Sequence, residues 1–209
     1  MAQKTLSVWR RLWLALSNAK YQILSVGFVY VVSVSIGIIM VHSQNEFALH
    51  YRDKIVAKAQ ANDRAAIAYR EGRNLKAATI DFVENLIIGA VPQTIIGLTI
   101  VSPYGFAAFR GGIGGIVSVD KEHKSRLGDK KSAFYYFITI FLQLIPYSLA
   151  GGIGVKLGLS YFKKYPEYKD DKRYFGYPMG AIRDVGLTYL LVIPLFFIAS
   201  LWEFLSPWN

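Results

Sequence analysis

Long apolar stretches, separated by shorter polar segments, dominate the chain. The first runs from Tyr21 to Asn45, where 25 consecutive residues include no Lys, Arg, Asp or Glu. About 20 apolar residues in a helix span a hydrocarbon core of ~30 Å, and backbone in lipid must satisfy its own hydrogen bonds, which favours a helix. We therefore predict a first transmembrane helix over residues 21–42. A cleaved signal peptide is the alternative, but the apolar run is too long and no small-x-small cleavage site follows it.

A basic, tryptophan-containing segment precedes this helix, over residues 1–20. Its apolar side chains share one helical face and its basic side chains lie elsewhere: Leu6, Trp9, Trp13 and Leu16 against Arg10, Arg11 and Lys20. This pattern is typical of an amphipathic helix in the headgroup plane. The alternative is a positive anchor for the first span, and both readings place the segment beside anionic lipid headgroups.

Residues 43–77 are the one clearly aqueous stretch. They are rich in alanine and contain seven Lys and Arg against four Asp and Glu. Because neither Pro nor Gly occurs between Ser43 and Glu71, the composition predicts a helix of up to about 29 residues. We expect a solvated helical arm between spans, with a partner-binding arm as the alternative.

The second apolar block, Thr79–Val119, is too long for one span and short for two. It predicts a broken pair, with a span over Ile80–Val101 and a glycine-rich return, and with helix breaks at Pro92 and Pro103. Glycines destabilise an isolated helix, but small residues four apart let transmembrane helices approach closely. Gly111 and Gly115 have this spacing and are candidate packing residues.

A third block, Ala133–Phe162, contains Pro146 followed by a glycine-rich run. It predicts either one long tilted span or two half-helices that break at Pro146. Gly151 and Gly152 are further candidate packing residues. The last block, Val185–Trp208, predicts a plain span with tryptophan anchors at its end.

Together these blocks predict an all-α, polytopic bundle of about four to six transmembrane helices, with two Pro/Gly-broken or re-entrant blocks and a helical membrane domain over residues 78–209. Composition agrees. Of 209 residues, 53% are apolar and 18% charged, whereas soluble domains are about 25% charged. The acid-free first twenty residues, with four basic side chains, favour a cytoplasmic N-terminus.

Ionisable groups at membrane depth are costly and are therefore functional candidates. Asp81, Glu84 and Asn85 share one helical face near the start of the second span. They could bind a cation or relay protons, and the alternative is simple compensation of the helix dipole. Arg110, among glycines, and Glu203, near the end of the last span, are the other candidates; Glu203 could equally be an interfacial residue in water.

Catalysis finds little support in the sequence. The chain contains no Cys, and its three histidines occur without a metalloprotease or hydrolase motif. We predict no catalytic residue, no metal site and no cofactor. The net charge of +10 is dispersed over loops beside the spans, which indicates attraction to lipid headgroups rather than nucleic-acid binding.

Several motifs resemble the stage II sporulation protein M family. They are DFVENLIIGAVPQTIIGL, the following P-x-G-F-x-x-x-x-G-G-x-x-G, IPYSLAGGIGVKLG and the closing ASLWEFLSPW, and they cover about Lys76 to Pro207. Glu203 with Ser206–Pro207 is the most specific piece. The sequence departs after Pro146, where Tyr147 stands at a position that is often polar in the family.

The resemblance implies a multi-span inner-membrane protein without catalytic activity. It implies a scaffold or subunit that recruits partner proteins, such as a cell-wall enzyme or an ATPase. A second hypothesis is a permease or channel subunit, whose broken helices would enclose a cavity at membrane depth. A homo-oligomer is a further option for either role.

Overall fold

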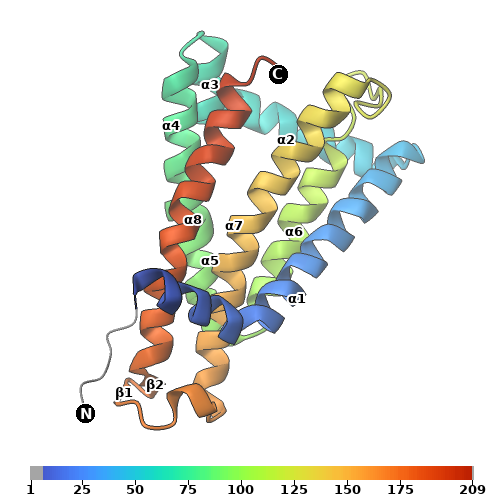
Figure 1. The fold of residues 1–209 in the computed structure, drawn as a ribbon. Helices are drawn as coiled ribbons and strands as arrows, with labels where there is room; N and C mark the ends of the chain where they lie inside the picture. Colours follow the sequence, from blue (N-terminus) through green and yellow to red (C-terminus); the bar gives the residue numbers. More distant parts are fainter. Residues whose placement is uncertain (1–6, 209) are drawn as a thin grey trace.

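The computed structural model describes residues 7–208, and it confirms an all-α bundle of long helices (Figure 1). In chain order the helices are α1 (Val8–His42), α2 (Glu46–Asn62), α3 (Arg64–Arg70), α4 (Asn74–Glu84), a π-helical segment (Asn85–Ala90), α5 (Val91–Ile96), a 3-10 turn (Gly97–Thr99), α6 (Ser102–Ile116), α7 (Lys130–Phe162), a 3-10 turn (Pro166–Tyr168) and α8 (Met179–Leu205). A short hairpin of β1 (Arg173–Tyr174) and β2 (Tyr177–Pro178) lies between α7 and α8.

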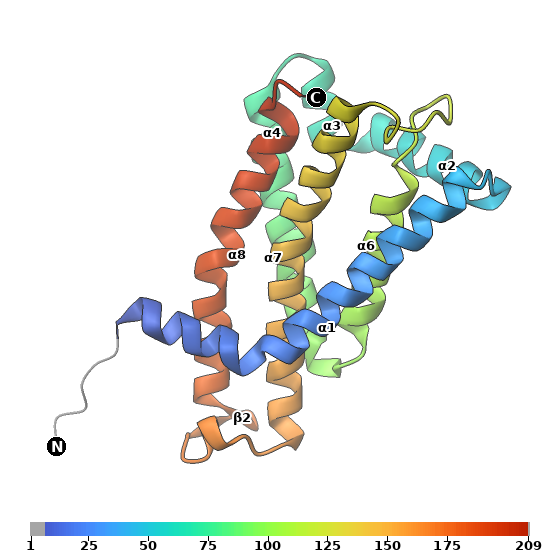
Figure 2. The same ribbon diagram turned by 45° about the vertical axis from the view of Figure 1, so that its right-hand side comes forward.

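Four helical segments are long and apolar enough to cross a membrane: Val8–His42, Asn74–Thr99, Lys130–Phe162 and Met179–Leu205. The chain is therefore an integral membrane protein. The 15 residues of α6 extend about 22 Å at 1.5 Å per residue. In both views α6 returns upward from the lower end of α5, and α8 ends opposite the end where α1 begins (Figures 1 and 2). The shorter α6 thus runs from the lower to the upper end of the bundle, and we predict that it makes a fifth pass.

α1 is a single helix that changes direction. Its first turns lie across α8 near the lower end of the bundle, and the remainder rises along α6 and α7 (Figure 2). Leu12, Ala15 and Ala19 are buried in this crossing, while Trp9 and Trp13 are exposed. Residues 8–20 of the first expected segment and residues 21–42 of the second are therefore parts of one helix, and residues 1–6, with Leu6, lie outside the described residues.

The single long helix expected within residues 43–77 is wrong. Asp63 ends α2 and begins α3, where its side-chain oxygen accepts a hydrogen bond of 2.8 Å from the amide of Ala66. A short acidic side chain competes with the helical backbone in this way and favours a new N-terminus. Nor does the segment project as a free arm, because α2 lies across the upper end of the bundle (Figure 1) and buries Leu49 and Arg52.

A helix break at Pro146 is also wrong, because α7 continues through it. An internal proline costs about 3 kcal/mol, but every residue from Pro146 to Lys156 is buried against other helices, and this packing holds the helix together. Pro92 follows the π-helical segment, so the helix there changes type without ending. The chain turns only at Ile100, with a φ of 68°, and Pro103 lies in the first turn of α6.

Glycines lie where helix backbones meet. A Cβ atom at Gly111 would lie 2.5 Å from the carbonyl oxygen of Tyr30, and one at Gly115 would collide with the backbone of Val34 and Gly37. On α7, Gly152 meets the backbone of Ile23, and Gly151 instead meets the side chain of Gln93. α1 consequently packs closely against both α6 and α7.

Candidate functional site

A cavity of about 1170 Å³ with a mixed apolar and charged lining lies within the bundle, with walls from α1, α4, α6, α7 and α8. It extends upward to α2, α3 and the 117–129 loop, whose residues line its upper end. Seven charged side chains line it, four acidic and three basic: Asp63, Asp81, Asp120, Glu203, Arg70, Arg110 and Arg126. Three of them, Asp81, Arg110 and Glu203, lie on helices of the membrane-spanning bundle, where charge is costly unless it has a role, so this cavity is the candidate site.

Arg110 of α6 is held among aromatic rings and an amide. Its guanidinium carbon lies 4.2 Å from the ring centre of Tyr147 and 5.1 Å from that of Phe106. Its Nη1 donates a hydrogen bond of 3.4 Å to Oδ1 of Asn85, which also accepts one of 2.5 Å from the Tyr147 hydroxyl. Ring faces attract cations most strongly where water is excluded, so these two rings stabilise the half-buried arginine on α6.

Two carboxyl groups line the cavity from different helices. The Ser200 hydroxyl donates a hydrogen bond of 2.6 Å to Oδ2 of Asp81, and the Gln143 amide donates one of 2.7 Å to Oε2 of Glu203. Buried polar groups need such partners. The hydrogen bond to Asp81 joins α4 to α8, and the one to Glu203 joins α7 to α8. These bonds hold the two carboxyl groups in place on the cavity wall.

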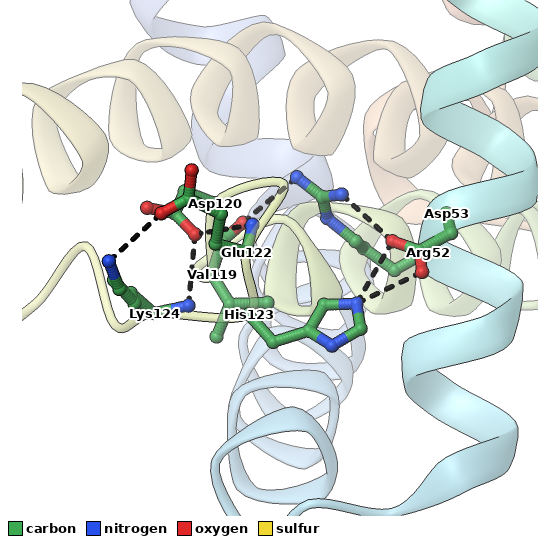
Figure 3. Close-up of polar contacts among 7 residues, drawn as sticks. All are labelled: Arg52, Asp53, Val119, Asp120, Glu122, His123 and Lys124. Atoms are coloured by element: carbon green, nitrogen blue, oxygen red, sulfur yellow. Dashed lines mark hydrogen bonds and ion pairs between the residues drawn. The ribbon is translucent and has the colours of Figure 1, made fainter.

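Outside the membrane-spanning segments, a clamp of Arg52, Asp53 and His123 joins α2 to the loop after α6 (Figure 3). The carboxylate of Asp53 accepts hydrogen bonds of 2.9 Å from both Arg52 and the Nε2 of His123. Arg52 also donates one of 3.3 Å to the carbonyl oxygen of Val119. The hydrogen bond from Arg52, aided by His123, holds the pKa of Asp53 below its ordinary value of 3.8.

The clamp involves the loop that follows α6, and Asp120 on this loop lines the cavity. Its Oδ1 accepts hydrogen bonds of 2.8 Å and 2.9 Å from the amides of Glu122 and Lys124. Both hydrogen bonds lower the pKa of Asp120, and the one from the Lys124 amide has the larger effect. This fixes the loop conformation at the upper end of the cavity.

A separate polar cluster lies at the lower end, between α7, α8 and their connection. The ammonium of Lys156 lies 2.7 Å from Oε1 of Glu167 and 3.3 Å from the ring centre of Tyr165. The Tyr168 hydroxyl donates a hydrogen bond of 2.7 Å to Asp184. Desolvation raises the pKa of Tyr168, and Asp184 adds to the rise. None of these residues lines the cavity.

The structure brings four of the five predicted polar candidates into or against one site. Asp81, Arg110 and Glu203 line the cavity, and Asn85 contacts Arg110. Glu84 does not line it. Sequence reasoning passed over Tyr147, which supplies an aromatic ring to Arg110 and a hydroxyl to Asn85.

Among residues 7–208, no group of three or more His, Asp or Glu side chains is arranged to hold a metal ion. The arrangement is suited to holding a charged group at membrane depth by hydrogen bonds and ring faces. Comparisons of the chain with models of known protein families, with curated proteins and with solved structures find no match.

Proposed function

We propose that this integral membrane protein is a permease-type subunit that binds a polar or charged group inside its helix bundle, without catalysing a reaction. The cavity with Asp81, Arg110 and Glu203 supports this proposal. Binding sites of transport proteins commonly lie at membrane depth, where helices are interrupted. Here the π-helical segment interrupts the second block, and Ile88 of this segment lines the cavity.

Cysteine accessibility tests whether the cavity admits hydrophilic compounds. The chain has no native cysteine, so Thr139→Cys places a single thiol on the cavity wall. Gly105→Cys on α6 is the matched control, because its Cβ has no atom within 4 Å and it lies outside the cavity lining. In liposomes, a charged methanethiosulfonate should modify the Thr139→Cys variant at least tenfold faster than the Gly105→Cys variant. Equal, slow modification of both variants would show a dry cavity and overturn the proposal.

The resemblance to the stage II sporulation protein M family supports a place for this subunit in a larger assembly, with an ATPase or a cell-wall enzyme as partner. We propose an inner-membrane location with the N-terminus in the cytoplasm, on the strength of the acid-free, basic start of the chain.

A scaffold that recruits a protein partner is the second candidate, and the surface of α2 favours it. His50, Lys54 and Lys58 are exposed at four-residue spacing, so they form one basic face over the upper end. Such a face suits an acidic partner surface. Deleting residues 50–70 is a poor test, because Arg52 and Ala65 are buried there.

Charge reversal on this face leaves the buried contacts intact. The pair Lys54→Glu and Lys58→Glu should abolish co-purification of a partner identified by mass, while insertion and elution volume stay unchanged. Lys76→Glu, an exposed lysine on α4, is the control. If the reversed variant retains the same partner as the wild type, the scaffold role through α2 fails.

A further inference from the structure

An apolar groove of about 270 Å³ lies beside this cavity, between α1, α2 and α6. Its walls include Gly37 and Met40 of α1, and Gly112 and Ile116 of α6. A Cβ atom at Gly112 would meet no atom within 4 Å, so this glycine leaves open space in the groove. In an integral membrane protein, apolar space of this kind suits a hydrocarbon chain.

The groove and the cavity share two residues. Phe109 and Ile113 of α6 line both spaces, so a molecule that extends past these two side chains would occupy both. Ile88, on the π-helical segment, also lines the cavity, and both Ile88 and Phe109 are well exposed. The wall of the cavity at this level is therefore apolar and accessible.

The helices that carry this wall diverge toward the upper end. α4 packs against α3 and α8, whereas α6 packs mainly against α1. Both views place α4 and α6 on opposite sides of α7 (Figures 1 and 2). Ile88 and Phe109 line the cavity between these two helices and are apolar and exposed, as side chains that contact lipid are.

The cavity itself has mixed charge. Four acidic side chains and three arginines line it, a pattern that matches a headgroup with both signs better than a purely anionic one. A guanidinium has five donors, and Asn85 accepts one hydrogen bond from Arg110, which leaves donors for a phosphate. Asp81 and Glu203 provide carboxyl oxygens for an ammonium.

We propose that the ligand of this site is a zwitterionic phospholipid from the surrounding bilayer, with its phosphate at Arg110, its ammonium toward Asp81 and Glu203, and one acyl chain past Phe109 in the apolar groove. This inference rests on the proposed function, because it uses the same cavity and names the class of compound that the cavity holds. An amphiphile accounts for a cavity with charged side chains and an apolar groove that meet at two shared side chains.

Filling the groove tests the acyl-chain contact. Gly112→Leu places a side chain in the groove, and Gly105→Leu is the matched control on the same helix, where the Cβ also meets no atom within 4 Å and the residue lines neither space. The probe is phosphatidylethanolamine with a diazirine in its acyl chain, in liposomes that contain the whole protein. We expect photo-crosslinks near Phe109 and Ile113 that fall at least tenfold in Gly112→Leu and are unchanged in Gly105→Leu. Equal crosslinking in both variants would overturn the inference.

Competition separates this inference from the proposed function. Unlabelled phosphatidylethanolamine should suppress the crosslink at a concentration at least tenfold lower than glycerophosphoethanolamine, which has the headgroup and no chains. Equal competition by the two, with the thiol of the Thr139→Cys variant still reactive, would overturn the lipid assignment and leave the proposed function standing. Stronger competition by phosphatidylglycerol would overturn the zwitterionic assignment. An unreactive thiol in the Thr139→Cys variant would overturn the proposed function itself.

Discussion

At the scale of single residues, two cations that are removed from water, Arg110 and Lys156, are held by side chains from other segments of the chain. Arg110 contacts Asn85 and Tyr147, and Lys156 contacts Glu167. An ammonium or guanidinium removed from water is stable only with such partners. Substitutions of the partners should therefore cost more than substitutions in exposed pairs.

Glu167→Gln provides such a test. The side chain of Lys156 is 3% exposed and that of Glu167 28% exposed, so the variant leaves a buried ammonium without its carboxylate. We expect the free energy of unfolding to fall by about 1–3 kcal/mol, measured by thermal denaturation in mild detergent. Glu122→Gln is the control, because its partner Lys124 is 74% exposed and surface pairs contribute about 0–1 kcal/mol. Equal losses in the two variants would contradict the role of burial.

The clamp at Asp53 should depend on pH. Its pKa in the folded state lies below 3.8, chiefly through the hydrogen bond from Arg52. A lowered pKa contributes stability that is complete above the ordinary value and is lost as pH falls through the folded value. The melting temperature of the wild type should therefore exceed that of Asp53→Asn from pH 7 down to about 4, and the two should converge below. A constant difference down to about pH 3, past the ordinary pKa of an aspartate, would exclude this contribution.

At the scale of helices, close packing depends on where glycines point. Gly115 faces the backbone of α1, whereas Gly112, three residues earlier, faces open space. The same residue type thus has opposite roles within one turn of α6. Helix pairs in lipid associate through such close approaches, since hydrocarbon does not drive apolar surfaces together.

Gly115→Ala should consequently destabilise the bundle. The added methyl collides with backbone atoms of Val34 and Gly37, which cannot move as a flexible side chain can, and overpacking costs about 1–3 kcal/mol. Gly112→Ala should be neutral or raise stability by about 0.5–1 kcal/mol, through helix propensity alone. Thermal midpoints of both variants in the same detergent measure the difference. Matched midpoints would show that α1 and α6 separate freely.

At the scale of the whole molecule, α6 decides the topology. The four long apolar segments alone would place the start of α1 and the end of α8 on one side, whereas α6 returns from the lower to the upper end, and these two helix ends lie at opposite ends of the bundle (Figures 1 and 2). The upper end carries α2, α3 and the clamp, and the lower end carries the β1–β2 connection (Figure 1).

Single cysteines test this arrangement in the cysteine-free chain. In intact cells, a membrane-impermeant maleimide should label Pro207→Cys, while Ser7→Cys should react only after permeabilisation, as a cytoplasmic N-terminus requires. The reverse pattern would keep five passes and invert the orientation. Labelling of both from one side would contradict the fifth pass.

The sequence by itself determined that this is an all-α membrane protein, where its apolar segments lie, and which polar residues would cost free energy inside a bilayer. These features follow from the bilayer in which the protein lies. Its hydrocarbon requires long apolar helices and disfavours isolated charge, regardless of how the helices pack. Asp81, Arg110 and Glu203 could be recognised for this reason before their positions in space were known.

Only the tertiary structure decided which of these residues meet and which breaks occur. Pro146 stays within a helix because packing offsets its missing hydrogen bond, and Tyr147 joins the site because α7 turns it toward Arg110 and Asn85. Such contacts depend on helix rotation and distance between segments far apart in the chain. Local patterns of polarity do not encode either quantity, so the cavity and its neighbouring groove became visible only in three dimensions.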